Sequence, residues 1–523
     1  MSDYIGYKWL AEQLKISAVQ PFTVESKVGA KRRTHIVDHI REETYPLAQR
    51  PAPTVANHLS FALKHEIVNL EFLYRLFMKV EKDEIEAWVG TARTSVYARR
   101  AGFLYEWLTG RQLNVPDLTI GNYIDALDSN RYLVATRPLN VQRWRVRDNL
   151  PGTREFCPVV VRTESVSHIE AYDCAQALQQ LERQYGTDLL MRSAVWLSIK
   201  ESRASFQIEH EERHVDRVRR FAAAMENRCG RDGDPLSPKA LEELQVAILG
   251  AATRYGLRKS PVFVGHTSAF TNIVDYIAPH WDHTKDLLHG LQAFLAKTKG
   301  ASSILRAAVA SFGFVYIHPM ADGNGRISRF LINDVLRRDG AVPAPFILPV
   351  SATITDSPRE RAGYDRSLEV LSKPLMVKYQ ELYEFAAVET YEDGVESNFR
   401  FDAYDDAASA WRYPNLTQQC EFVGHVVQMT IEVEMSKEAN YLRGIERARE
   451  GVKNYLEGPN TDIDKIIRSV RDNGWQLSGK LIKDFPQLQD EALGQLIVVA
   501  VREALDPPAS ADDEEVPAEA PRP

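Results

Sequence analysis

The residues that could do chemistry are gathered in one short stretch, which begins at His318 and ends at Arg329. His318 follows an apolar helical segment and precedes Pro319. Proline cannot continue a helix, so we expect the imidazole to lie at a fixed break in the chain. An imidazole with its ordinary pKa of about 6.5 can take a proton from an attacking hydroxyl. The position of His318 therefore predicts a general base.

The residues that follow have the types and the order that bind phosphate. Residues 323–325, Gly-Asn-Gly, lead into a helix, and glycines let a backbone approach a ligand closely. The first amides of that helix are unpaired donors at the positive end of its dipole, which suits phosphate oxygens. Arg326 and Arg329 add permanent positive charge, and Asp322 offers the hard oxygen that Mg²⁺ prefers. The stretch therefore predicts a polyphosphate site with a magnesium ion.

Each of these residues taken alone has an ordinary structural explanation. An isolated Gly-Asn-Gly is usually a turn, Asp322 alone reads as the N-cap of the next helix, and Arg329 alone reads as part of a solvated helix face. Their order across a single helix-loop-helix is hard to explain by capping alone. The combination therefore favours the chemical interpretation.

A known family carries the same pattern. The segment His318-Pro319-Met320-Ala321-Asp322-Gly323-Asn324-Gly325-Arg326-Ile327-Ser328-Arg329 resembles the Fic motif, HPFx(D/E)GNGRxxR. The one departure is Met320, where the family usually has Phe; Met is an adaptable apolar filler, so we expect activity to be kept and the loop to be anchored less rigidly. The resemblance implies an all-helical catalytic core that transfers AMP from ATP to a Ser, Thr or Tyr hydroxyl of a target protein.

The same resemblance implies a role for each position. It assigns the general base to His318, the magnesium ligand to Asp322, the anion hole to Gly323, Asn324 and Gly325 with Asn324 facing the α-phosphate, and the neutralisation of the β- and γ-phosphates to Arg326 and Arg329. ATP and Mg²⁺ are therefore the expected cofactors. Such transfer depends mostly on positioning and on charge stabilisation, which agrees with these residue types.

An upstream segment could regulate this loop. Ser205 and Glu209 lie one helical turn apart and so share a face, which alone would indicate only an amphipathic helix. The segment from Ser205 to His210 is similar to the family's inhibitory motif, (S/T)xxxE(G/N), with His210 in place of Gly or Asn. The resemblance implies that Glu209 pairs with Arg329 and withholds it from the γ-phosphate. In some relatives this glutamate positions water for removal of AMP, so de-AMPylation through Glu209 stays open.

Two further features resemble parts of the family's site. Short strands are expected at 262–265 and 273–277, where relatives carry a β-hairpin flap that holds the target by strand addition. Tyr364 resembles a tyrosine that lines the adenosine pocket, with Gly363 replacing the first member of the usual tyrosine pair. An incidental hairpin and a buried core tyrosine are the structural alternatives.

The elements that must position these residues are mostly helical. Apolar spacing predicts helices over 7–14, 95–108, 235–256, 283–297, 301–316 and 324–338, helical structure over 166–225 with a break near 201–203, and a strand near 31–37. Residues 376–505 read as all-helical, and their end resembles a small helix-turn-helix bundle. We therefore expect a mostly α fold: a Fic-type helical core with a small β-hairpin flap, flanked by an N-terminal α+β region and a C-terminal helical bundle.

The expected domain order follows from these elements. Residues 1–165 form an N-terminal α+β region of unknown role, which looks like part of a subset of long bacterial Fic proteins. Residues 166–375 form the Fic catalytic domain, with an inhibitory helix near 205–210. Residues 376–505 form the C-terminal helical region, and the acidic segment 506–523, rich in Pro and Ala, is expected to be disordered.

Composition limits the class of protein. With 44% hydrophobic and 26% charged residues, the 523-residue chain is typical of a soluble globular protein. The net charge of -8 disfavours nucleic acid and anionic membranes as partners, without excluding nucleic acid. The four cysteines lie far apart and form no CxxC pair, which argues against a zinc ribbon and favours a reducing compartment. No signal peptide and no apolar run of about 20 residues is found, so we expect a cytoplasmic protein.

Other functions stay open on the sequence alone. A nucleotide-sensing regulatory protein could bind DNA or a partner through the C-terminal bundle, although Lys480 and Lys483 are sparse for a recognition helix. A third hypothesis keeps the fold but uses another nucleotide or a phosphocholine carrier as donor. Gly325, where kinase-like relatives carry Lys, favours ATP and AMP transfer. The sequence does not identify the target protein, the biological role, or whether the chain forms a homo-oligomer.

Overall fold

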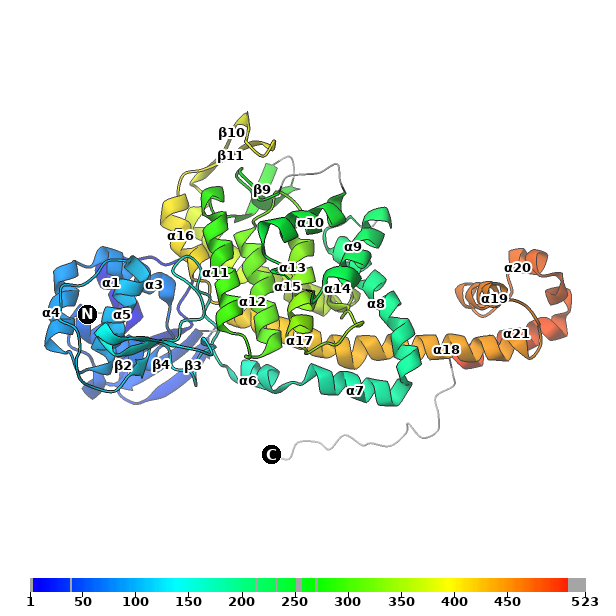
Figure 1. Ribbon diagram of the computed structural model, residues 1–523, viewed down its shortest axis with the longest axis horizontal. Coiled ribbons are helices and arrows are strands. Elements are labelled where there is room, and N and C mark those ends of the chain that lie inside the picture. Colours follow the sequence, from blue (N-terminus) through cyan, green and yellow to red (C-terminus); the bar gives the residue numbers. More distant parts are fainter. Residues whose placement is uncertain are drawn as a thin grey trace. The chain divides into compact units, whose positions relative to one another are not determined.

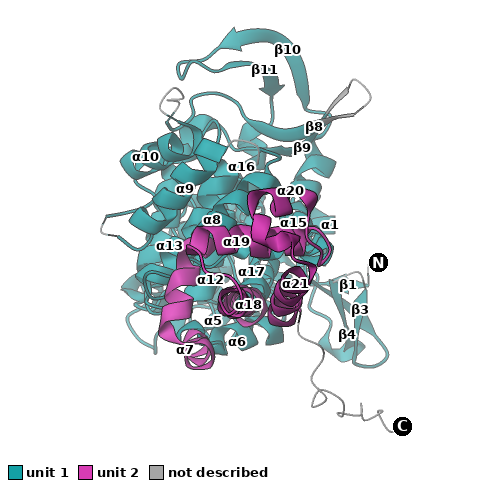
Figure 2. Cartoon of the chain, turned by 90° about the vertical axis from the view of Figure 1, so that its right-hand side faces the viewer, with its two compact units in different colours: residues 1–175, 198–430 teal, residues 176–197, 431–523 magenta. Residues whose placement is uncertain are grey.

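The computed structural model describes residues 3–37, 40–211, 215–231, 233–250, 256–268 and 271–506. Helices dominate these residues and the sheets are small, which confirms the expected mostly α class (Figure 1). Two compact units are present, namely Met1–Ala175 with Ser198–Thr430, and Gln176–Leu197 with Ile431–Pro523 (Figure 2). The expected N-terminal region and the catalytic loop fall in the first unit, while the boundaries at 165 and 375 stay predictions.

The N-terminal residues form a small sheet beside a helical cluster. The sheet has the order β1-β2-β4-β3, and β2 pairs with β4 in parallel. Its strands are β1 (Tyr4–Ile5), β2 (Val24–Gly29), β3 (Arg33–Val37) and β4 (Ile40–Pro46). The helices are α1 (Tyr7–Leu14), α2 (Val55–His65), α3 (Leu70–Lys79), α4 (Lys82–Thr91) and α5 (Val96–Thr109). Their apolar faces share one core that includes Leu59, Leu73 and Leu104.

A loop-rich stretch connects these helices to the catalytic core. It holds a three-stranded sheet of order β5-β7-β6, with strands β5 (Ile124–Asp125), β6 (Leu139–Val141) and β7 (Val146–Asp148). Arginines bind its backbone carbonyls: Arg99 donates to the oxygens of Trp144 and Asn122, and Arg100 donates to that of Asp125. Guanidinium donors therefore order a segment that has little regular structure of its own.

The loop that holds His318 and the glycines lies between two buried helices. The central pair is α12 (Ser303–Ile317) and α13 (Asn324–Arg338), and nearly every residue of both is buried. A helix that is apolar on all sides, as α12 is, belongs in the centre of a domain. The surrounding helices are α6 (Glu164–Ala171), α9 (Val215–Arg228), α10 (Pro238–Leu249), α11 (Thr284–Lys297), α14 (Val350–Asp356), α15 (Pro358–Tyr379) and α17 (Thr417–Met429). The loop is therefore supported on rigid elements.

One helix begins in the C-terminal unit and ends beside this loop. α8 (Thr187–Ile208) runs without interruption through 201–203, so the break expected there is wrong. The polar run that suggested a break is satisfied by distant partners. The carboxylate of Glu201 accepts two hydrogen bonds from Ser351, one from its backbone amide and one from its hydroxyl, both at 2.6 Å. Ser202 donates to the carbonyl of Val218 at 2.6 Å.

Two hairpins lie next to each other at one end of the core (Figure 2). The expected hairpin is present as β8 (Phe263–Ser268) and β9 (Thr271–Ile277), while its role as a flap stays a prediction. The second hairpin, β10 (Tyr383–Thr390) with β11 (Glu396–Phe401), corrects the expectation that 376–505 is all-helical. Its turn holds Asp393-Gly394, a dipeptide typical of hairpins, and Gly394 has φ 79°. Its aromatic residues pack on the flap, with the rings of Phe263 and Phe399 4.8 Å apart.

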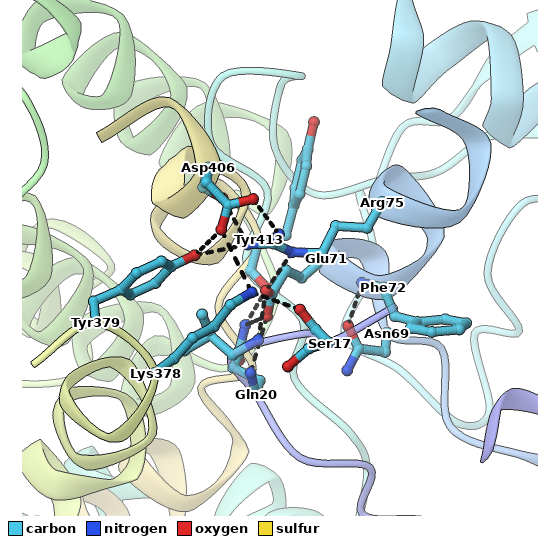
Figure 3. A network of polar contacts seen from close by, with 11 residues as sticks. Ser17, Gln20, Asn69, Glu71, Phe72, Arg75, Lys378, Tyr379, Asp406 and Tyr413 are labelled. Carbon is cyan, nitrogen blue, oxygen red and sulfur yellow. Dashed lines mark hydrogen bonds and ion pairs between the residues drawn. The ribbon is translucent and has the colours of Figure 1, made fainter. Parts of the chain in front are cut away.

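A polar network joins the N-terminal residues to the end of α15 and to α16 (Tyr404–Arg412) (Figure 3). Glu71 is fully buried and accepts hydrogen bonds from the amides of Val19 and Gln20. Arg75 donates to Glu71 at 3.0 Å and to Asp406 at 3.1 Å. Because a buried charge is costly unless it is paired, this network is a strong structural tie within the first unit.

The C-terminal unit contains a small helical bundle. It comprises α7 (Cys174–Tyr185) in part, the start of α8, α18 (Met435–Lys453), α19 (Asn460–Asp472), α20 (Gly479–Asp484) and α21 (Glu491–Leu505). A core that includes Ile463, Ile467 and Ile497 holds the last four helices together. The expected turns near 473–474 and 486 are present. The tail expected to be disordered lies, apart from Asp506, outside the described residues.

Across the described helices, none combines the length and the apolar character needed to cross a bilayer.

Candidate active site

His318 stands at the end of α12 in a left-handed conformation, with φ 49° and ψ 56°. Its ring Nδ1 lies 3.1 Å from the carbonyl oxygen of Val315. A carbonyl oxygen can only accept, so Nδ1 carries the hydrogen and Nε2 keeps its lone pair. This tautomer leaves Nε2 able to take a proton.

The surroundings of His318 keep the ring neutral. Burial first, and then the positive charge of Arg258, lower the pKa of His318 to about 4, although the Val315 carbonyl and Glu209 act in the opposite direction. The neutral form is the one that can act as a base. The imidazole is therefore in the basic form throughout the neutral pH range.

Arg258 positions the base, and its role gave no sequence signal. Its side chain donates to the carbonyl oxygen of His318 at 2.6 Å and to that of Ser260 at 3.0 Å, and also to that of Pro279. Its backbone amide donates to Pro319 at 2.9 Å. Burial lowers the pKa of Arg258 to about 10, which still leaves it charged at neutral pH. One guanidinium thus joins the loop to both ends of the flap.

The glycine-rich turn is closed by Asn324. Its side-chain Nδ2 donates to the Met320 carbonyl at 2.8 Å, and its Oδ1 accepts from the Met320 amide at 3.0 Å. Met320 is fully buried, as an anchor of the loop should be. Gly323 has φ 90°, which favours glycine, and residues 324–325 enter the first turn of α13, where amides have no partner within the helix. The side chain of Asn324 serves the loop, and its predicted contact with an α-phosphate stays a prediction.

Asp322 is suited to a magnesium ion held together with phosphates. Its side chain is half exposed, and its Oδ1 accepts from the Gly323 amide at 2.5 Å and from Arg326 at 3.0 Å. Among the described residues, no cluster of three His, Cys, Asp or Glu side chains could hold a metal without other ligands. A single exposed carboxylate fits Mg²⁺, which usually takes one or two carboxylates and completes its shell with water and phosphate oxygens.

Arg329 is buried and fully engaged. It donates from Nη2 to Glu209 Oε1 at 2.7 Å, from Nε to the Ser205 hydroxyl at 2.8 Å, and from Nη2 to the Ser205 carbonyl at 3.0 Å. Burial raises the pKa of Glu209, but the charge and the hydrogen bond of Arg329 outweigh it and the pKa is lowered overall. The structure thus brings Ser205, Glu209 and Arg329 together as an ion pair supported by a hydroxyl.

Tyr364 lies next to the same arginine. Its hydroxyl accepts from Arg329 Nη1 at 3.3 Å, and its ring lies between those of Phe312 and Phe422, 6.2 Å from each. The tyrosine is buried. The structure therefore brings Tyr364 to the motif arginine, while its adenosine contact stays a prediction.

The other motif arginine is also paired, which the sequence did not predict. Arg326 donates through Nη1 to Glu211 and through Nη2 to Asp322. Glu211 follows the C-terminus of α8, where its amide donates to the Phe206 carbonyl at 2.9 Å and the His210 amide donates to Gln207 at 3.0 Å. These two bonds form a Schellman cap, a C-terminal helix cap in which the penultimate residue of the motif has a left-handed conformation. His210 takes that position with φ 59°, a conformation that favours Gly or Asn.

Comparison with known proteins agrees with this geometry. Residues 235–336 match the Fic/DOC family. The chain is 30% identical over 169 residues to a protein named protein adenylyltransferase fic-1 from Caenorhabditis elegans, a match that covers 31% of this chain and 30% of that protein. It is 37% identical over 87 residues to protein adenylyltransferase Fic from Aedes aegypti, covering 16% of each.

The match is local. It spans less than a third of the length of these curated relatives. A Fic family protein from Desulfovibrio desulfuricans G20 is similar with a TM-score of 0.37 and 18% identity, over 63% of this chain and 87% of that one, which is too distant to carry an argument. The family match includes the segment from Arg258 to the motif arginines. The similarity to the Fic/DOC family therefore lies in residues 235–336, which hold the glycine-rich loop.

Proposed function

We propose that this chain is a protein adenylyltransferase, which transfers AMP from ATP to the hydroxyl of a target protein. The observation that carries the proposal is the contact between Nδ1 of His318 and the Val315 carbonyl, which leaves Nε2 as the acceptor at the start of a glycine-rich turn that ends in two arginines. The names of the relatives, protein adenylyltransferase, support it.

The chemistry follows from these positions. Nε2 of His318 takes the proton from a Ser, Thr or Tyr hydroxyl, and the hydroxyl oxygen attacks the α-phosphorus of ATP. The bond between the α-phosphorus and the bridging oxygen breaks, and pyrophosphate leaves. The amides of residues 323–325 face the developing charge, and the two arginines balance that of the leaving group. Mg²⁺ held by Asp322 would supply further positive charge to the phosphates.

The target would be held at the flap. β8 and β9 form a two-stranded sheet, to which an extended segment can add as a further strand. Arg258 connects Ser260 and Pro279, at the two ends of the flap, with the carbonyl of His318.

The four cysteines are free and buried, which supports residence in a reducing compartment, and we propose the cytoplasm.

In the proposed resting state the enzyme is inhibited by Glu209. The γ-phosphate would need the guanidinium of Arg329, which is already paired with Glu209 and Ser205. ATP that binds without this contact would lie in an unproductive orientation. Removal of AMP through Glu209, and a purely nucleotide-sensing role, stay predictions.

Labelled ATP tests the proposed reaction. The Glu209→Gly chain is incubated with cell lysate and with ATP labelled at either the α- or the γ-phosphate. The Glu209→Gly chain with His318→Ala added is the control, and its label, including the γ label that protein kinases of the lysate transfer, is subtracted. We expect the remaining label on protein to come from α-labelled ATP alone, because pyrophosphate carries the γ label away. Remaining label from the γ position, or no α label above that of the control, would disprove the assignment.

A further inference from the structure

We propose that Glu211 is a second inhibitory carboxylate, which holds Arg326 as Glu209 holds the other motif arginine. In the resting chain neither motif arginine is then free to bind a polyphosphate. The inference rests on the proposed function, because it concerns access of ATP to the same site. It adds a residue that the inhibitory motif does not contain.

The contacts of Arg326 show how completely it is occupied. Its side chain is 3% exposed; Nη1 donates to Glu211, and Nη2 donates to Asp322 at 3.0 Å. The guanidinium carbon lies 5.0 Å from the centre of the Phe206 ring, within the range of a cation–π contact. Nε is buried and has no hydrogen-bond partner among the residues that the structure describes. Two carboxylates and one ring thus fix the guanidinium in place.

The turn at His210 makes the double contact possible. Along a continuing helix, residues two apart point in widely different directions, so Glu209 and Glu211 could not face one surface. The left-handed conformation of His210 reverses the chain after α8, and the bond from the Glu211 amide to the Phe206 carbonyl holds that reversal. The helix cap therefore places one carboxylate on each motif arginine.

A third arginine helps to retain Glu211 in this position. Arg217, on α9, lies with Nη1 3.5 Å from the Glu211 carboxylate. Both side chains are about one third exposed, so solvent weakens this pair. Arg217 is outside the glycine-rich loop, and its contact with Glu211 therefore offers a way to weaken the second inhibitory contact without changing the nucleotide site.

The two contacts would discriminate between nucleotides. A triphosphate must displace both carboxylates before its β- and γ-phosphates reach the arginines, whereas AMP needs only the adenosine pocket and the amides of residues 323–325. When one interaction changes the affinity for a ligand elsewhere in a protein, the change is typically about 5- to 150-fold. We therefore expect the resting chain to bind ATP with little preference over AMP, and a strong preference for ATP after both carboxylates are neutralised.

Nucleotide affinity measures this directly. All chains carry His318→Ala, which prevents turnover, and the dissociation constants of Mg-ATP and AMP are measured by isothermal titration calorimetry. The variants are Glu211→Gln, Glu209→Gln, both together, and Arg217→Gln. Glu242→Gln, at an exposed position of α10, is the control. We expect Glu211→Gln to tighten ATP binding about tenfold and the double variant to exceed either single one. Arg217→Gln should give a smaller gain, and AMP affinity should change less than about twofold.

The outcomes separate the two proposals. If Glu211→Gln leaves ATP affinity unchanged both with and without Glu209→Gln, the contact of Glu211 with Arg326 does not oppose ATP binding. That conclusion holds whichever group the enzyme transfers. If ATP binding tightens as expected but the variant with an intact His318 transfers no AMP, the inhibitory role of Glu211 stands and the proposed reaction fails. Thermal unfolding of each variant checks that the chain is folded at the temperature of the titration.

Discussion

The carboxylate of Glu209 lies against the backbone of Gly325, so closely that a Cβ on that glycine would come within 2.2 Å of Oε1. The segment that carries Glu209 thus fits a surface from which a side chain is missing. Gly325 has no positive φ and belongs to α13, so its conformation alone does not demand glycine. Glycine is needed at position 325 because the Glu209 carboxylate lies against it. This need can be tested separately from any role of Gly325 in catalysis.

Gly325→Ala should be destabilising only while Glu209 is present. With Glu209 in place, the added methyl displaces the carboxylate from Arg329, at a cost of about 1–3 kcal/mol. In the Glu209→Gly chain the clash with the carboxylate is gone and only Arg329 Nη1 stays close, at 3.3 Å from the added Cβ. If that side chain shifts by a few tenths of an ångström, alanine in a helix should be neutral or stabilise by up to about 1 kcal/mol. Differential scanning calorimetry of the four chains in this cycle measures the difference. Equal effects in both backgrounds would contradict the contact.

His210→Gly should stabilise the chain and tighten inhibition. A residue with a Cβ at φ 59° carries a strain of about 1 kcal/mol that glycine does not. We expect a higher unfolding midpoint and lower residual AMP transfer, because both inhibitory contacts depend on the left-handed turn. His210→Ala keeps the strain and is the matched control, since the histidine side chain is exposed. A midpoint that rises equally in both variants would rule out strain as the cause.

Asn324→Ala should destabilise the chain as well as inactivate it. The substitution leaves the buried amide and carbonyl of Met320 without their partners, which costs about 2 kcal/mol or more. Asn324→Asp keeps the acceptor for the Met320 amide and loses the donor to the Met320 carbonyl. Its stability should therefore lie between those of the unchanged chain and of Asn324→Ala. Thermal unfolding is measured beside AMP transfer by chains that also carry Glu209→Gly. Lost activity with an unchanged midpoint would show that Asn324 acts on the nucleotide alone.

The value of kcat/KM for AMP transfer should not fall as the pH is lowered through the neutral range. Because the pKa of His318 is lowered to about 4, the base is deprotonated above that value and becomes protonated only below it. For the Glu209→Gly chain, kcat/KM should stay level from pH 8 to about 5 and fall near 4. Glu209 raises the pKa of His318, so its removal cannot move the limb upward. A limb centred near 6.5 would mean that the ring is not shielded as the structure indicates.

The helix-loop-helix of the site could be predicted because its signals are local. Pro319 ends one helix, and the glycines at 323 and 325 begin the next, so a few adjacent residues determine the geometry. The resemblance to the Fic family also predicts the hairpin and the pairing of Glu209 with Arg329. The contact with Gly325 is not predicted, because nothing local distinguishes a glycine required by a distant carboxylate from one required by a phosphate.

The remaining features depend on contacts between distant segments. Arg258 is a single arginine in a loop, and only the folded chain shows that it meets three carbonyl oxygens. Glu211 faces the site because of the conformation of its neighbour His210, which is rare for a residue with a Cβ. The apparent break at 201–203 arose because Glu201 is polar, and its partner Ser351 is 150 residues away.

The bonds of Arg258 also bear on which alcohols could react. They attach the backbone carbonyl of His318 and the carbonyls at both ends of the hairpin to one guanidinium, so we expect the gap between a peptide aligned on that hairpin and Nε2 to vary little. Serine and threonine reach across such a gap by one carbon, and tyrosine reaches across it by a whole ring. The protein should therefore sort its substrates by reach, accepting either the short alcohols or the phenol and refusing the other.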